Sequence, residues 1–240
     1  MNYTTSNNPL LTRAFKPTSL ESRAMTFDGT VTKTLSLFAV LIFGALLVVS
    51  LRPGGAVVIA AMIGGLALAV ATAFRPQAAR ITAVPWAFLQ GVLLGTVSVA
   101  LERSTHGVVG LAVALTGAAF LTMLAAYRSG LIRPSERFRA GVVGATGAIA
   151  FVYVLSFVLE LAGVRSMMGV DLGGSGVVGI GATVVVLVVA VLNLVLDFDF
   201  IEQAVAKGAP RSMEWFAAFS LTVTLIWIYI QFLELLGGED

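Results

Sequence analysis

Two aspartates follow a long apolar run in the segment LNLVLDFDFIEQAV, which spans Leu192 to Val205. Asp197 and Asp199 are two positions apart, and Glu202 comes three positions after Asp199. Carboxylates can bind cations and can hold exchangeable protons. In a helix with about 100° between successive residues, Asn193 and Asp197 share one face, whereas Asp199 and Glu202 lie nearly opposite. The two aspartates are therefore not expected to line one cavity.

The next helical segment carries a second polar face. Among Leu, Ile, Val, Phe and Trp, polar residues recur there at helical spacing: Ser220, Thr224, Gln231 and Glu234. A serine or threonine of a membrane helix can also bond a carbonyl of its own helix, which is the alternative for the first two. Gly208-Ala209-Pro210 is a turn signal, so the two segments should form an antiparallel hairpin. Folding near residue 209 brings Asp197 level with about position 221, within reach of the polar face.

The composition sets the class of protein. Of the 240 residues 58% are hydrophobic and only 12% are charged, and the mean hydropathy is +0.96. Soluble domains have about a quarter of their residues charged, so this is an integral membrane protein. No cysteine is present, which excludes disulfides and thiolate metal sites. The net charge of only +2 does not indicate a nucleic-acid partner.

Seven stretches are long and apolar enough to span a bilayer, which takes about 20 residues per helix. We predict an all-α bundle of seven transmembrane helices near Thr34–Leu51, Gly55–Phe74, Val84–Leu101, Gly107–Ala126, Gly141–Ala162, Gly176–Leu196 and Met213–Leu236. Residues 1–30 are polar and are expected to be a mobile cytoplasmic tail rather than a signal peptide, and residues 31–240 to be the transmembrane domain.

The basic residues predict the orientation. Cytoplasmic loops are enriched in Lys and Arg. Twelve of the fifteen fall on one side: Arg13, Lys16, Arg23, Lys33, Arg75, Arg80, Arg128, Arg133, Arg137, Arg139, Lys207 and Arg211. The other side has Arg52, Arg103 and Arg165. The N-terminus is therefore predicted to be cytoplasmic and Asp240 external, with DFDFIE at the cytoplasmic end of the sixth helix.

Three carboxylates near this predicted boundary have an ordinary alternative explanation: Asp199, Glu202 and Glu214. They can be solvated there, and Lys207 and Arg211 offer them partners. Glycines predict close helix packing in three places, namely Gly91 with Gly95, then Gly141, Gly144 and Gly147, and then Gly176, Gly179 and Gly181. Asp197, with Asn193 on its face, is the stronger functional candidate because polar groups at membrane depth are costly.

The hairpin also carries a resemblance to a known family. The run VLDFDFIEQAVAKGAPRSMEWFAAFSLTVTLIWIYIQFLELL resembles the last two helices of the Bax inhibitor family, the transmembrane Bax-inhibitor-motif proteins, in its YccA-like bacterial branch. MTFDGTVTKT, PWAFLQGVLLGTVS and FLTMLAAYRSGLIRPSERFRAGV are similar to further segments of that family. Together these matches cover most of the chain from Met25 to Leu236.

The resemblance implies a bundle with helix seven at its centre, acting as a proton-sensitive calcium leak in the cell (inner) membrane. It implies a sensor of two aspartates that share a proton, one late in helix six and one in helix seven, with an arginine of helix two nearby. Asp197 matches the first aspartate, and Thr224 stands at the second. Helix two has no arginine, and Gln90 stands where related sequences often have glutamate.

The threonine changes what the pair can do. Two close carboxylates titrate as a coupled pair, whereas threonine cannot ionise. Asp197 is then expected to act as a single-site sensor and gate, together with Thr224, Asn193 and the nearby Asp199. Ser220, Gln231, Glu234 and Gln90 are the pore-lining candidates. Because Ca²⁺ prefers several oxygen ligands, this thin path predicts weak, transient calcium contact at Asp197.

Three classes of function follow from these features. The first is a pH-modulated cation leak channel, with calcium as the transported ion and no cofactor. The second is a regulatory protein whose tail engages a membrane protease or another membrane partner, as the resemblance to the YccA-like branch implies. The third is an enzyme or photoreceptor, which we do not expect. His106 lies alone in a loop, no metalloprotease motif is present, and helix seven has no lysine that could hold a retinal.

Overall fold

The computed structural model describes residues 24–161 and 177–237, and these ranges are helical almost throughout. The helices are α2 (Phe27–Leu51), α3 (Gly55–Phe74), the short 3₁₀ helix η1 (Pro76–Ala78), α4 (Ala79–Ser104), α5 (Val108–Arg128), α6 (Glu136–Leu161), α7 (Val177–Ala206) and α8 (Met213–Gly237). Seven helices in the described ranges are long and apolar enough to cross a membrane, which confirms the predicted class and number of spans.

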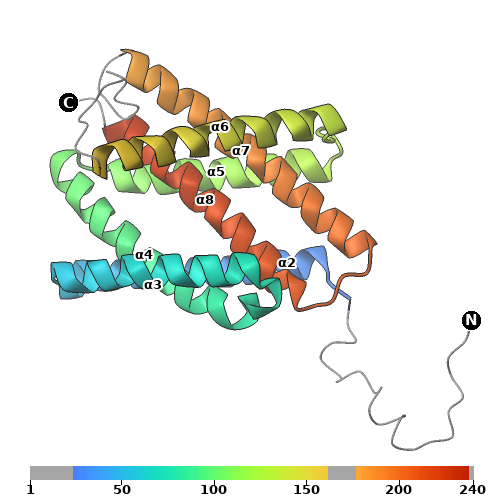
Figure 1. Ribbon diagram of the computed structural model, residues 1–240, viewed down its shortest axis with the longest axis horizontal. Helices are drawn as coiled ribbons and strands as arrows, with labels where there is room; N and C mark the ends of the chain where they lie inside the picture. The colour runs from blue at the N-terminus through green and yellow to red at the C-terminus, as the bar shows by residue number, and fades with distance from the viewer. Residues whose placement is uncertain (1–23, 162–176, 238–240) are drawn as a thin grey trace, which may run out of the picture.

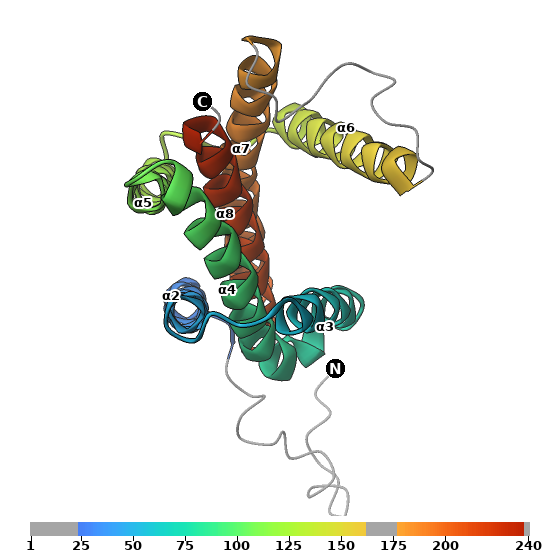
Figure 2. The same cartoon turned by 90° about the vertical axis from the view of Figure 1, so that its left-hand side faces the viewer.

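Helix α8 is the centre of the bundle, as predicted. In its apolar stretch 56% of the residues are buried, against at most 33% in any other helix. It packs against α7, α2, α5 and α4 (Figures 1 and 2). Leu221, Leu225 and Ile228 of α8 meet Leu194 and Phe198 of α7 in the largest buried cluster. The hairpin is therefore the core around which the other helices are arranged.

Helices α2 and α7 extend furthest beyond their predicted bounds. Helix α2 begins at Phe27 rather than near Thr34, because the hydroxyl of Thr26 accepts a hydrogen bond from Gly29 N (3.0 Å) and caps the first turn. Helix α7 continues to Ala206, so DFDFIE lies inside the helix and not at its end. Residues 1–23 of the predicted tail lie outside the described ranges, whereas residues 24–30 belong to the bundle.

The three glycine predictions have different outcomes. Gly91 and Gly95 bring α4 against α2: a Cβ at Gly91 would overlap the carbonyl oxygen of Leu41, and one at Gly95 would lie 2.7 Å from Ala45 Cα. The packing prediction is confirmed there. It is wrong for Gly141, Gly144 and Gly147, because a Cβ at these positions would meet nothing within 4 Å. These glycines lie in α6, which is at the periphery of the bundle, packs on α7 (Figure 2) and has 6% of its apolar stretch buried. Of the third set, Gly176 lies outside the described residues, and a Cβ at Gly181 would meet nothing within 4 Å.

Candidate functional site

Asp197 lies between the two arms of the α7–α8 hairpin, where two hydroxyl groups meet it. Ser220 Oγ donates a hydrogen bond to Asp197 Oδ1 (3.0 Å), and Thr224 Oγ1 donates one to Asp197 Oδ2 (2.6 Å). Each carboxyl oxygen thus has its own donor from α8. The prediction that the polar face of α8 reaches Asp197 is confirmed: Ser220 and Thr224 lie on either side of position 221, which a fold near residue 209 brings level with Asp197.

The hairpin turn and the core fix this register. Gly208 has φ +67°, a left-handed conformation that is least costly for glycine, and its neighbours close the chain reversal. Met213 N donates to Pro210 O (2.9 Å), which starts α8 directly after the turn. Leu194, Val195 and Phe198 surround Asp197 on α7 and are fully buried. The carboxyl group therefore has few positions other than the one that faces α8.

Asn193 does not join this group, although it lies one turn before Asp197. Its amide nitrogen donates to Thr146 Oγ1 of α6 (2.8 Å) and to Val189 O of its own helix (2.9 Å). The side chain is thereby directed toward α6 rather than α8. The predicted grouping of Asn193 with Asp197 is wrong. The two side chains point about 40° apart around the axis of α7, and this difference is enough for them to face different neighbouring helices.

Asp199 and Glu202 have partners of their own. Asp199 Oδ2 pairs with Arg139 of α6 (2.8 Å) and accepts from Gln203 Nε2 (2.8 Å). Glu202 accepts a hydrogen bond from the hydroxyl of Tyr127 in α5. The partners are thus not Lys207 and Arg211, because α5 and α6 stand beside this part of α7. The predicted separation of the two aspartates is confirmed, and Asp199 is not part of the Asp197 group.

The remaining pore-lining candidates lie elsewhere. Gln231 is buried and its amide nitrogen donates to Glu234 (3.0 Å), about two turns beyond Thr224 on α8. Gln90 is half-buried in α4, which packs against α2, α3 and α8. Within the described ranges the Asp197 group therefore consists of the carboxyl group and the hydroxyls of Ser220 and Thr224.

Glu214 is buried rather than solvated, so that part of its predicted explanation is wrong, whereas its predicted pairing with Arg211 is present. Its side chain is only 1% exposed. It accepts hydrogen bonds from Thr26 N (3.0 Å) and Thr26 Oγ1 (3.1 Å), pairs with Lys33, and lies 3.8 Å from Arg211 Nε. Met25 N also donates to Ala209 O in the hairpin turn (2.8 Å). The residues that precede α2 are thus hydrogen-bonded to the turn of the hairpin and to the first turn of α8.

A signal for this contact was present in the sequence. Lys33 lies at the predicted inner end of the first span, at the same depth as Glu214 in the first turn of the last one. A lone lysine and a lone glutamate at equal depth are expected to pair, since a buried charge is costly without a partner. What the sequence did not show is that α2 and α8 are neighbours.

The donor set of the Asp197 group fits transient cation contact. One carboxylate and two hydroxyls provide hard oxygen ligands, which suit Ca²⁺, but they are fewer than the six to eight of a storage site. In the described part of the chain no group of three or more His, Cys, Asp or Glu side chains could hold a metal ion. The Asp197 group thus offers a cation fewer oxygen ligands than a retained calcium ion would have.

Comparison with known proteins identifies the family. The family model described as Bax inhibitor 1 like matches residues 8–238 of the 240-residue chain. The chain belongs to the Bax inhibitor family. No curated protein and no solved structure matches it. In this Bax inhibitor protein, Thr224 occupies the position that the resemblance gives to the second sensor aspartate, and it contacts Asp197 directly. Helix α3 has no arginine and packs on α4, away from the Asp197 group.

Proposed function

We propose that this protein is a pH-modulated cation leak channel, with calcium as its preferred ion and the α7–α8 hairpin as its gate. The observation that supports the proposal is the carboxyl group of Asp197, held between Ser220 and Thr224 in the centre of the bundle. Among the described residues Asp197 makes no ion pair. An acid at membrane depth without a cationic partner is a candidate for binding a mobile cation or a proton.

The chemistry of a single carboxyl group gives the sign of the pH dependence. Ionised Asp197 attracts a cation and accepts both hydroxyl hydrogen bonds. When it binds a proton, the negative charge is lost and one of its oxygens becomes a donor. Thr224 then has a second acceptor, Ser220 O of its own helix, at 3.4 Å. We therefore expect the leak to rise with pH and to fall when Asp197 is protonated.

We propose that the protein lies in the cell (inner) membrane. In the proposed orientation, the end of the bundle that carries the ion pairs faces the cytoplasm. Lys33 with Glu214, Arg128 with Asp28, and Arg139 with Asp199 all lie at that end. A basic excess on one side favours the cytoplasmic side. Under this orientation Asp197 lies nearer the cytoplasmic end of α7 than the external end.

A second candidate function is regulation of a membrane partner, such as a membrane protease. One observation favours it: residues 25 and 26 are bonded to the hairpin turn and to Glu214. A partner that displaced this segment would act directly on the α7–α8 hairpin. Loss of partner regulation with unchanged ion flux, after deletion of the residues before Ala24, would favour this function over the channel.

The experiment that tests the channel proposal is ion flux into liposomes that contain the purified protein. Calcium, sodium and potassium are compared at an acidic and an alkaline pH, with protein-free liposomes as the control. The proposal expects calcium flux above the control that rises with pH. Flux equal to that of empty liposomes for all three ions would overturn it.

A further inference from the structure

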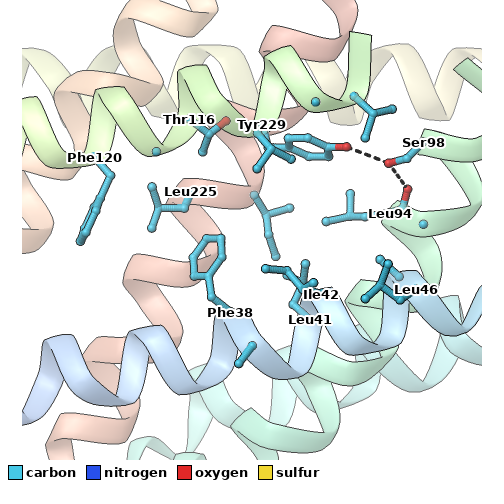
Figure 3. A pocket seen from close by; sticks show the side chains of 18 of the residues that line it. Phe38, Leu41, Ile42, Leu46, Leu94, Ser98, Thr116, Phe120, Leu225 and Tyr229 are labelled. Carbon is cyan, nitrogen blue, oxygen red and sulfur yellow. Dashed lines mark hydrogen bonds between the residues drawn. The ribbon is translucent and has the colours of Figure 1, made fainter. Parts of the chain in front are cut away.

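A long groove lies between α2 and α5, apart from the Asp197 group. Its volume is about 880 Å³, and α4 and α8 form its floor (Figure 3). On α2 the lining runs from Thr34 to Val49, which is about 22 Å at 1.5 Å per helical residue. Most labelled side chains of its body are apolar: Phe38, Leu41, Ile42, Leu46, Leu94, Phe120 and Leu225. The labelled Thr116 donates its hydroxyl hydrogen bond to Ala112 O of its own helix (2.7 Å).

The groove opens sideways, toward the position of the bilayer. Helix α2 packs on α4 and α8, and α5 packs on α8 and α7, so that α2 and α5 lie apart (Figure 2) and residues of both line the groove. Wall residues such as Ile42, Leu46 and Leu121 are 49–63% exposed, although they belong to membrane-spanning helices. An apolar hollow offers water no hydrogen-bond partners, so hydrocarbon is the material that can fill it.

The two ends of the groove differ in chemistry. At one end lie aromatic rings: Phe198 packs against Phe120 (5.9 Å between ring centroids) and Tyr127 (5.8 Å). Beyond these rings, Arg128 of α5 pairs with Asp28 of α2 (2.7 Å). This ion pair connects α2 and α5 on the side of the aromatic rings.

At the other end the lining becomes polar. Ser98 and Glu102 lie one turn apart on α4, and the hydroxyl of Tyr229 is 2.7 Å from Ser98 Oγ (Figure 3). The carboxylate of Glu102 accepts hydrogen bonds from Gly107 N (2.7 Å) and Val109 N (3.1 Å), which places it at the start of α5. Glu102 is the one carboxylate among the residues that line the groove.

We infer that this groove binds one phospholipid, with an acyl chain along its apolar body and an amine-bearing head group at Glu102. A long groove with an apolar body and a polar end matches the apolar chain and polar head of a phospholipid. The hydroxyls of Ser98 and Tyr229 lie where the ester region of such a lipid would be. The charge of Glu102 complements the ammonium group of phosphatidylethanolamine and repels an anionic head group.

Two glycines allow a matched test. Gly117 of α5 lines the groove, and a Cβ there would meet nothing within 4 Å, so Gly117→Phe adds a phenyl ring at the wall of the groove. Gly144 of α6 also has nothing within 4 Å but does not line the groove. Gly144→Phe is therefore the control for adding a phenyl ring to a membrane-facing helix. Gly110→Phe is a second groove variant, also in open space, in case Gly117→Phe does not fold.

The measurement is native mass spectrometry of the full chain, purified in mild detergent and incubated with phosphatidylethanolamine or phosphatidylglycerol of equal chain length. We expect one phosphatidylethanolamine to remain bound to the parent and to Gly144→Phe. Gly117→Phe should reduce the bound fraction roughly tenfold, as expected when about two methylene groups of the chain lose their site. Glu102→Gln should abolish the preference for phosphatidylethanolamine, while its amide oxygen can still accept one of the two backbone hydrogen bonds.

Three outcomes would overturn the inference. Absence of a bound lipid in the parent would show that the groove is filled only by freely exchanging bilayer chains. Equal loss in Gly117→Phe and Gly144→Phe would place the lipid outside the groove. A mass equal to two copies of the chain, lost in Gly117→Phe, would show that a second copy covers the groove instead.

Discussion

Thr224 and Asp197 are joined by a hydrogen bond of 2.6 Å that connects the two arms of the α7–α8 hairpin. The donor is a hydroxyl, at the position where the family resemblance places a second carboxyl group. A hydroxyl can donate a hydrogen bond to the Asp197 carboxylate. Unlike a second carboxylate, it cannot take up the exchangeable proton of Asp197, and it has no negative charge that would repel Asp197. The hairpin thus has one titratable group at this level where a coupled pair would have two.

Thr224→Asp should restore such a pair and steepen the pH dependence of the leak. Two carboxyl groups this close are expected to share one proton, which holds α7 against α8. Loss of that proton as the pH rises leaves two negative charges that repel and open the hairpin. Calcium uptake by liposomes across a pH series measures the effect, with Thr222→Asp as a positional control. A profile identical to the parent's would contradict the geometry of the pair.

Lys33→Met should destabilise the protein by about 3 kcal/mol, the lower end of the range for a broken buried ion pair, because it removes the nearer cation of the buried Glu214 and leaves only Arg211 at 3.8 Å. The double variant Lys33→Met with Glu214→Gln removes both charges and should recover much of this loss. Unfolding by denaturant in detergent measures the free energies. If the single and double variants were equally unstable, the pair would contribute through packing rather than charge.

Gly91→Ala should separate α4 from α2 and cost about 1–3 kcal/mol of unfolding free energy, since a Cβ there overlaps the backbone of Leu41. Gly144→Ala adds the same methyl group in open space on α6 and should be neutral or slightly stabilising. Thermal unfolding of both variants in one detergent gives the comparison. Equal effects would mean that the α2–α4 contact tolerates wider spacing.

The loop between α5 and α6 should be cytoplasmic and the C-terminus external. Arg128, Arg133, Arg137 and Arg139 lie in or beside that loop, and a basic excess favours the cytoplasmic side. Reporter enzymes fused after Asp240 provide the check, because one type is active only outside the cytoplasm and the other only inside. Activity of the cytoplasmic reporter at this position would reverse the orientation.

The sequence was sufficient for those features that depend on hydrophobic length and on local turns. Seven apolar stretches predict seven spans, and Gly208-Ala209-Pro210 predicts the hairpin that brings Ser220 and Thr224 to Asp197. Both results follow from the cost of unpaired backbone in hydrocarbon and from helical rise. The number of spans and the contacts within the hairpin can be predicted without knowing which other helices pack against each other.

Features that depend on distant neighbours could not be predicted in this way. Asn193 faces α6, Asp199 pairs with Arg139, and Glu214 is buried against α2. Each result depends on which helix stands beside α7 or α8, and a single sequence does not contain that arrangement. The glycines of α6 show the same limit, because small residues permit close packing but do not require a partner helix.

The most direct test of the channel proposal compares Asp197→Asn with Asp199→Asn. Liposome calcium uptake is measured from acidic to alkaline pH for the parent and both variants. Asp197→Asn keeps the shape of the side chain but removes the ionisable proton, so uptake should become independent of pH and less selective for divalent ions. Asp199→Asn removes the charge that pairs with Arg139, outside the Asp197 group, and should keep the pH response of the parent. Equal, small effects of both substitutions would contradict the assignment of Asp197 as the gate.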